Sequence, residues 1–172
     1  RSMSVDYLKS LRAIADEFGI LLMFDEVQCG VGRTGKFYAH EWAGITPDIM
    51  ASAKGLGGGF PIGATLATER VAETMTAGSH GTTYGGNPLA VAAGNAVLDV
   101  VLAPEFLENV AKVSVEFMDG LKKLVAAYPD QLEDCRGKGL MVGLKCKVTN
   151  GDLVNKAIDH GLLSVPAGDN VV

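Results

Sequence analysis

The chain has 172 residues, of which 48% are hydrophobic, and it carries a formal net charge of −5. This length suits one domain or two small ones, and the absence of a basic run disfavours nucleic acid or an anionic membrane as a partner. We expect neither a membrane span, which needs about 20 apolar residues, nor a secretory signal. The three cysteines and three histidines are scattered, which favours free thiols in a reducing cytoplasm and disfavours a metal site.

Both ends of the sequence suggest a piece of a longer protein. The chain begins with Arg1-Ser2-Met3 and stops at Val171-Val172, an apolar ending typical of an interrupted strand. We therefore expect that further residues precede and follow it.

The first part of the chain alternates helical and strand-like segments. Ser4 is a suitable N-cap for a helix with apolar residues on one face, and Gly19 suits its end. Apolar runs predict strands over residues 20–24, 48–53 and 63–67, the first of them buried on both faces as in a parallel sheet.

Two helices are predicted after a loop over residues 78–87. Asn87 would cap the first of them, Pro88 would take its first helical position, and Pro104 would break it. Small residues along this helix permit close approach of another element, and we expect it to support dimerisation. The second helix has apolar residues spaced three and four apart and ends before Pro129.

The last part of the sequence has the pattern of a small α+β domain. Residues 139–146 and 162–165 are predicted to be strands, and residues 152–160 a helix between them. We accordingly divide the chain into residues 1–127 and 128–172.

Asp25 and Lys54 are the residues most suggestive of chemistry. Asp25 opens the tetrad Asp25-Glu26-Val27-Gln28, and both it and Lys54 follow predicted strands. Ligands of open α/β sheets bind at the carboxyl ends of strands, so the two side chains could converge there. A desolvated lysine would supply the neutral amine that attacks an aldehyde, and the acid would bind a protonated ring nitrogen, as pyridoxal phosphate requires. By spacing alone, a solvated loop lysine and a capping aspartate remain open.

Two other segments could contact phosphate. Thr82 and Thr83 lie just before the helix that starts at Pro88, where hydroxyls suit an anion, although ordinary turn threonines are equally compatible. The glycines at 57–59 lack the spacing of nucleotide-binding loops and are interpreted as a tight turn.

Three segments in this order resemble the pyridoxal phosphate-dependent class III aminotransferases. Residues 24–35 read FDEVQCGVGRTG, residues 47–63 read PDIMASAKGLGGGFPIG, and residues 80–90 read HGTTYGGNPLA. The resemblance covers nearly the whole chain. It implies an α/β fold of the type I transferase kind, comprising the carboxyl-terminal half of a large domain with a mostly parallel sheet and part of a small α+β domain.

The resemblance also implies a role for each matched position. Lys54 would bind the cofactor aldehyde and then carry a proton between substrate and cofactor. Asp25 would pair with the ring nitrogen, Val27 would pack on the ring face, and Gln28 would bind the phenolic oxygen. Glu26 belongs to the same cofactor-binding tetrad.

The remaining implications concern partners and substrates. Thr83 would reach the cofactor phosphate of a neighbouring subunit and Thr82 would lie near the substrate, which implies a homodimer; Arg136 is treated as structural. The overall likeness is greatest to members that move the terminal amine of N-acetylornithine to 2-oxoglutarate in arginine synthesis. Ornithine, succinylornithine and 4-aminobutyrate remain open as amine donors, and a non-catalytic dimerisation piece is the alternative of another class. Without the family's amino-terminal half, we expect this chain to be inactive and to bind pyridoxal phosphate weakly.

Overall fold

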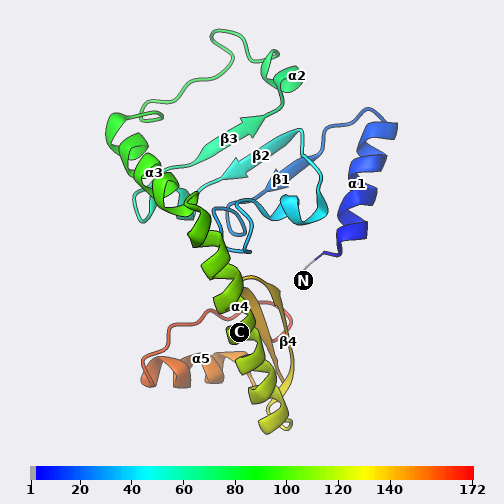
Figure 1. Cartoon of the computed structure of the whole chain (residues 1–172), viewed down its shortest axis with the longest axis vertical. Helices are drawn as coiled ribbons and strands as arrows, with labels where there is room; N and C mark the ends of the chain where they lie inside the picture. Colours follow the sequence, from blue (N-terminus) through cyan, green and yellow to red (C-terminus); the bar gives the residue numbers. More distant parts are fainter. Residues whose placement is uncertain (1–2) are drawn as a thin grey trace. The chain divides into compact units, whose positions relative to one another are not determined.

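A computed structural model describes residues 3–172, so that Arg1 and Ser2, cited above for the start of the chain, lie outside the described residues. The described chain forms two compact units, Met3–Val110 and Ala111–Val172, and the division falls within helix α4 (Pro104–Ala127) (Figure 1). The domain boundary predicted between residues 127 and 128 is thus close to the end of the helix that runs from one unit into the other, and it stays a prediction.

A three-stranded sheet forms the centre of the first unit. Its strands are β1 (Met23–Asp25), β2 (Ile49–Ser52) and β3 (Ala64–Ala67), in the order β1-β2-β3. Strand β1 is parallel to β2, with Asp25 opposite Ala51, and β3 is antiparallel to β2. All three predicted strands are present, but β1 is shorter than predicted. The prediction that it is buried on both faces is wrong within the described residues, because Met23 is 65% exposed.

Local signals explain the helix ends of this unit. Helix α1 (Val5–Glu17) begins where Ser4 accepts a hydrogen bond from the Tyr7 amide at 3.2 Å, and Gly19 follows its end with φ of 63°. The apolar face predicted for α1 is only partly buried, because Phe18 is exposed. A short helix α2 (Glu69–Ala72), which the sequence analysis missed, follows β3.

A buried carboxylate joins three elements of this unit. Asp48 accepts hydrogen bonds from the Leu22 amide at 2.8 Å, Arg12 at 2.7 Å and Arg70 at 2.9 Å. The bond from the Leu22 amide, followed by that from Arg12, lowers the pKa of the Asp48 carboxyl to about 2. Asp48 thereby links α1 and α2 to the start of the sheet.

Helix α3 (Pro88–Val101) packs on the 3-10 helix η2 (Lys54–Gly57). It starts as predicted, since the Asn87 side chain accepts a hydrogen bond from the Ala90 amide at 2.9 Å. A Cβ atom at Gly94 would lie 3.6 Å from the Leu56 carbonyl oxygen, so a small residue lets η2 approach the helix closely. The small residues of α3 therefore allow close packing of η2 from the same chain. Dimerisation through α3 stays a prediction.

The second unit contains a hairpin and a helix. Strands β4 (Leu132–Lys138) and β5 (Met141–Cys146) pair antiparallel, and α5 (Asn150–Asp159) follows. The sequence analysis missed β4, whose residues are mostly polar and show no apolar run. The strand predicted over residues 162–165 is wrong. The free edge of β5 is used instead by Val172, which exchanges two backbone hydrogen bonds with Leu144 at 2.7 and 3.0 Å.

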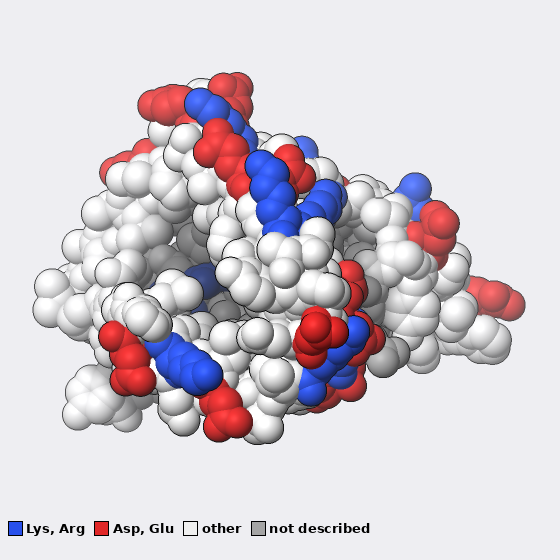
Figure 2. All heavy atoms as spheres, turned by 90° about the horizontal axis from the view of Figure 1, so that it is seen from below, with Lys and Arg blue, Asp and Glu red and all other residues white. Residues whose placement is uncertain are grey.

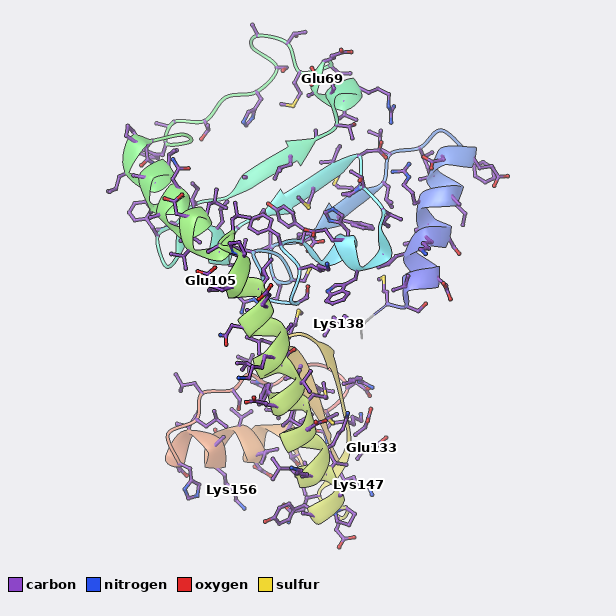
Figure 3. The ribbon with its side chains drawn as sticks, viewed as in Figure 1. Glu69, Glu105, Glu133, Lys138, Lys147 and Lys156 are labelled. Carbon is purple, nitrogen blue, oxygen red and sulfur yellow. The ribbon has the colours of Figure 1, made fainter. Side chains whose placement is uncertain are left out.

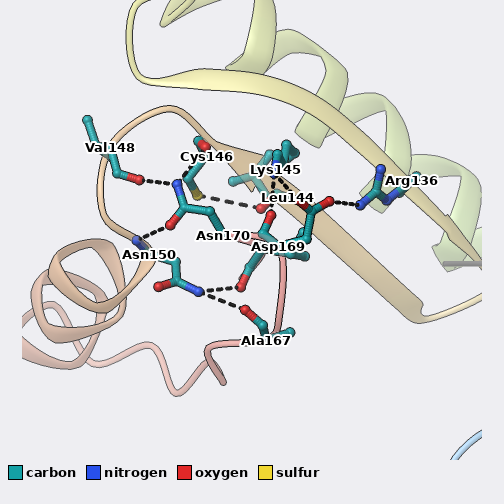
Figure 4. Close-up of polar contacts among 10 residues, drawn as sticks. Arg136, Leu144, Lys145, Cys146, Val148, Asn150, Ala167, Asp169 and Asn170 are labelled. Carbon is teal, nitrogen blue, oxygen red and sulfur yellow. Dashed lines mark hydrogen bonds and ion pairs between the residues drawn. The ribbon is translucent and has the colours of Figure 1, made fainter.

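The side chain of Asn170 fixes this return of the chain to β5 (Figure 4). The amide nitrogen of Asn170 donates to the carbonyl oxygens of Cys146 and Val148, both at 2.7 Å. Its amide oxygen accepts from the backbone of Asn150 at 2.8 Å. The turn is thus tied to both the end of β5 and the start of α5.

Charged side chains of this unit contact Asp169 in the same turn and the backbone at Pro129. Arg136 lies 3.5 Å from the Asp169 carboxylate, which also accepts from Lys145 at 2.8 Å (Figure 4). Lys147, labelled in Figure 3, donates to the Pro129 carbonyl oxygen at 2.7 Å. These contacts support the structural role expected of Arg136.

Lysine and arginine are interspersed with aspartate and glutamate on the face shown in Figure 2. No single described helix is long and apolar enough to cross a bilayer, although the bent pair α3 and α4 together would pass on length and composition.

Candidate functional site

The carboxyl ends of β1 and β2 bring the predicted site residues together. Asp25 is the last residue of β1, and Lys54 follows β2 directly after Ala53, at the start of η2. The Lys54 amine donates a hydrogen bond to the side-chain oxygen of Gln28, in the loop after β1. Lys54 thus contacts one member of the tetrad, because the parallel pairing brings the ends of the two strands to one edge of the sheet. The convergence of Asp25 with Lys54 stays a prediction.

Asp25 keeps one carboxylate oxygen available. Its Oδ1 atom accepts a hydrogen bond from the Val27 amide at 2.9 Å, which forms a local turn. For this one oxygen, Asp25 is thus the capping aspartate that the sequence left open. Within residues 3–172 its other oxygen has no hydrogen-bond partner. A protonated ring nitrogen is a suitable donor for this free acceptor.

The backbone at Lys54 has an unusual conformation. Its φ is 48°, in the left-handed region that non-glycine residues seldom adopt, and Val31 nearby has φ of 55°. Such outliers cluster at functional sites, where the surrounding structure holds them. A Cβ atom at Gly55 would lie 3.3 Å from Val31 Cβ, so the two outliers belong to one packed region.

The side chain of Lys54 is not shielded from water in this part of the chain. The sequence left open a desolvated lysine and a solvated loop lysine, and Lys54 is exposed among the described residues. The reason is that Ala53 and Gly55 are too small to cover a long amine, and nothing else within residues 3–172 encloses it. Of the two alternatives, the solvated loop lysine therefore describes Lys54 in this part of the chain.

Glu26 differs from the rest of the tetrad, because its side chain points into the protein. It is only 2% exposed and accepts from the backbone amides of Ala39 at 2.9 Å and His40 at 2.8 Å. The His40 ring nitrogen lies 3.1 Å from the same carboxylate, and the Cys29 thiol lies 3.0 Å from it. A carboxylate offers about four acceptor positions, so no position remains for a cofactor. The structure gives Glu26 a supporting place rather than direct contact with a ligand.

Cys29 fits the expectation of an unreactive thiol. Burial, and secondly the hydrogen bond to Glu26, raise the pKa of Cys29 to about 12. All three cysteines are free, as predicted.

Thr82 and Thr83 lie in a separate loop, between α2 and α3. The Thr82 hydroxyl accepts from the Gly85 amide at 3.1 Å, which matches an ordinary turn threonine. Within the described residues, neither threonine forms a hydrogen bond with Lys54 or with the tetrad. The structure thus does not join this loop to the other predicted site residues in one chain.

His40 is the site neighbour that the sequence analysis missed. His40 lies in the 3-10 helix η1 (Ala39–Ala43), from which it contacts Glu26. Its ring stacks on the Tyr38 ring with a centroid distance of 5.8 Å. No local motif connects His40 with Glu26, so only the course of the intervening loop could have revealed the pair. Among residues 3–172 no group of three or more histidine, cysteine or acidic residues is placed to hold a metal.

The arrangement suits a ligand with an aldehyde and a basic ring. An exposed amine, a carboxylate with a free acceptor and an amide lie at one edge of the sheet, and they match the three polar groups that pyridoxal phosphate presents on its ring. The donor set therefore fits this cofactor.

Comparisons with known proteins agree with this geometry. The sequence profile of the family Aminotransferase class-III matches residues 1–172. The acetylornithine aminotransferase of Brucella melitensis is 60% identical over all of this chain, and that of Mesorhizobium japonicum is 58% identical. The chain covers 43% of each of these two proteins, so it spans less than half of their length.

Solved structures show the same fold. The ornithine aminotransferase of Plasmodium yoelii superimposes with a TM-score of 0.90 at 34% identity, over 98% of this chain and 46% of its own. The N-acetylornithine aminotransferase of Stenotrophomonas maltophilia gives a TM-score of 0.84 at 38% identity, over 95% of this chain and 43% of its own.

Proposed function

We propose, from the premise that this chain belongs to the class III aminotransferase family, that it carries the lysine-bearing half of the active site of a pyridoxal 5'-phosphate-dependent transaminase. The observation that carries the proposal is the contact between Lys54 and Gln28 at the carboxyl ends of adjacent parallel strands. Because the chain spans less than half of its relatives, the complete activity requires residues beyond those in this chain.

Each residue of the site has a proposed task. The Lys54 amine would hold the cofactor aldehyde, and it would carry a proton from the amine-bearing carbon of the substrate to the cofactor. Asp25 accepts a hydrogen bond from the ring nitrogen through its free oxygen, and Gln28 binds the phenolic oxygen. Val27 packs on the ring face. The bound cofactor supplies an electron sink for the carbanion that forms when the proton leaves.

Glu26 has an indirect task in this proposal. Its four polar contacts are all with the protein, so it supports the loop that carries Val27 and Gln28 rather than binding the cofactor.

The threonine loop is assigned to a second subunit. Thr83 binds the phosphate of the cofactor held by a neighbouring subunit, and Thr82 lies near the substrate there. Support comes from the exposure of this loop and from its lack of hydrogen bonds to Lys54 within residues 3–172. The proposal therefore includes a homodimer, placed in the cytoplasm because free cysteines favour a reducing compartment.

N-acetylornithine and 2-oxoglutarate are the proposed substrates. The terminal amine of N-acetylornithine is exchanged for a carbonyl oxygen, giving N-acetylglutamate semialdehyde, and 2-oxoglutarate takes the amine to become glutamate. This choice is supported by the names of relatives 58–60% identical over the whole chain, and it places the enzyme in arginine biosynthesis. Ornithine is the second candidate, because the Plasmodium yoelii ornithine aminotransferase shares the fold with a TM-score of 0.90.

A chimera tests the proposed substrate. In the chimera, this chain replaces the matching 172 residues of the Brucella melitensis relative. We expect it to transaminate N-acetylornithine with 2-oxoglutarate, and to have a kcat/KM for N-acetylornithine well above that for ornithine. A higher kcat/KM for ornithine would make ornithine, and not N-acetylornithine, the assigned amine donor. A folded chimera without any transaminase activity would favour a non-catalytic interaction piece instead.

A further inference from the structure

We propose that Glu26 is a positioning residue, whose carboxylate joins the loop after β1 to η1 and so holds Gln28 against Lys54. The inference rests on the proposed function and deepens it, because it assigns a task to the one member of the tetrad that is turned away from the ligand.

Glu26 is fixed from both its backbone and its side chain. Its amide donates to the Ala51 carbonyl oxygen at 2.9 Å, which continues the pairing of β1 with β2. Its carboxylate accepts from the Ala39 and His40 amides and contacts the His40 ring nitrogen, and both residues belong to η1. The residue therefore joins two segments that are separated by the whole intervening loop.

The donors around this carboxylate fill it completely. Oε1 accepts from the His40 amide at 2.8 Å and lies 3.1 Å from the His40 ring nitrogen. Oε2 accepts from the Ala39 amide at 2.9 Å and the Cys29 thiol at 3.0 Å. Each oxygen accepts from a backbone amide, so the side-chain nitrogen of a glutamine would face an N–H donor in either orientation. Glutamate is thus chemically selected here over glutamine.

The loop between these anchors has little freedom. The Gly30 amide donates to the Glu26 carbonyl oxygen at 2.9 Å, and a Cβ atom at Gly30 would lie 2.7 Å from that oxygen. Val27 and Gln28 lie between the anchored residue and this tight turn. A shift of the Glu26 side chain would therefore be passed to Gln28, which touches Lys54.

The test compares Glu26→Gln with Glu41→Gln in the chimera. Glu41 is a matched control, since its exposed carboxylate also accepts a backbone amide next to η1, that of Tyr38 at 2.7 Å, but forms no hydrogen bond with residues 25–30 among the described residues. The readouts are the thermal midpoint, the affinity for added pyridoxal phosphate, and the pH midpoint of the visible absorbance band of the bound cofactor. That pH midpoint reports the polar contacts of the ring and Lys54, whereas a purely structural residue would change only the thermal midpoint.

We expect Glu26→Gln to weaken cofactor binding about tenfold and to move the pH midpoint by about one unit, as loss of one well-placed hydrogen bond does. Glu41→Gln should change neither. In a Gln28→Ala background, Glu26→Gln should give no further shift of the pH midpoint, because Glu26 acts through Gln28. If Glu26→Gln does not fold, the same readouts are taken on His40→Ala, which removes the ring nitrogen beside Glu26 but keeps the backbone amide of residue 40.

The opposite results separate the two proposals. A pH midpoint unchanged by Glu26→Gln, or shifted equally with and without Gln28, would overturn the positioning role while leaving the proposed function intact. Absence of a visible band in the unsubstituted chimera would overturn the proposed function itself.

Discussion

Lys54 donates a hydrogen bond to the side chain of Gln28 although the two residues come from different strand-to-loop junctions. The parallel pairing of β1 with β2, in which Asp25 lies opposite Ala51, brings these junctions to one edge of the sheet. Main-chain pairing thus brings the Lys54 amine and the Gln28 side chain together, and Asp25 ends the strand that precedes Gln28.

Replacement of Asp25 tests the proposed contact with the ring nitrogen. In the chimera, Asp25→Asn keeps the size of the side chain but removes the charge that pairs with a protonated ring. A charge-assisted hydrogen bond of about 1.5–3 kcal/mol corresponds to cofactor binding that is about 10- to 100-fold weaker, with a larger loss of kcat. Titration with pyridoxal phosphate and single-turnover assays measure both effects. Unchanged kcat would show that Asp25 does not touch the ring.

Acid unfolding tests the Asp48 network. The pKa of Asp48 in the folded state, about 2, lies below the value of about 3.9 in an unfolded chain. The unfolded state therefore binds more protons between about pH 4 and pH 2, and the stabilisation by Asp48, present above pH 4, is lost as the pH falls through that window. Denaturant unfolding at a series of pH values should show that Asp48→Asn costs roughly 1–3 kcal/mol at pH 7 and progressively less towards pH 2.

Asp16→Asn is the control for this measurement. Asp16 also pairs with Arg12, at 2.6 Å, but its side chain is 66% exposed. Its loss should change the free energy of unfolding by about 0.5 kcal/mol or less. Equal effects of the two substitutions would show that buried Asp48 stabilises the fold no more than exposed Asp16 does.

Gly30 tests the close packing of the loop after β1. An added methyl group would lie 2.7 Å from the Glu26 carbonyl oxygen and 3.0 Å from the Tyr38 ring, so Gly30→Ala should destabilise the chimera by roughly 1–3 kcal/mol. Gly120→Ala is a matched change in helix α4, where no atom outside the helix backbone lies within 4 Å. It should stabilise by about 0.5–1 kcal/mol, and thermal unfolding should show opposite signs for the two variants.

The predictable parts of this chain are those set by local chemistry. Ser4 and Asn87 mark the starts of α1 and α3 because their side chains cap the next turn, and apolar runs locate the three strands of the first unit. Parallel order of the first two strands then suffices to bring Asp25 and Lys54 to one edge.

The unpredicted parts depend on contacts between distant segments. Strand β4 is polar and exists through its pairing with β5, while residues 162–165 lack a ladder because Val172 occupies the β5 edge. Likewise, no sequence signal shows that Glu26 turns inward to His40. The exposure of Lys54 was left open by the sequence, because burial depends on what covers a strand end, which neighbouring residue types do not determine.

Reduction with borohydride after addition of pyridoxal phosphate tests the central claim most directly. In the chimera, reduction converts the covalent link between cofactor and lysine into a stable amine, and peptide mapping then identifies the labelled residue. We predict a single labelled peptide with the cofactor on Lys54, and no label after Lys54→Ala. A label on any other lysine, or a label that persists in Lys54→Ala, would contradict the account.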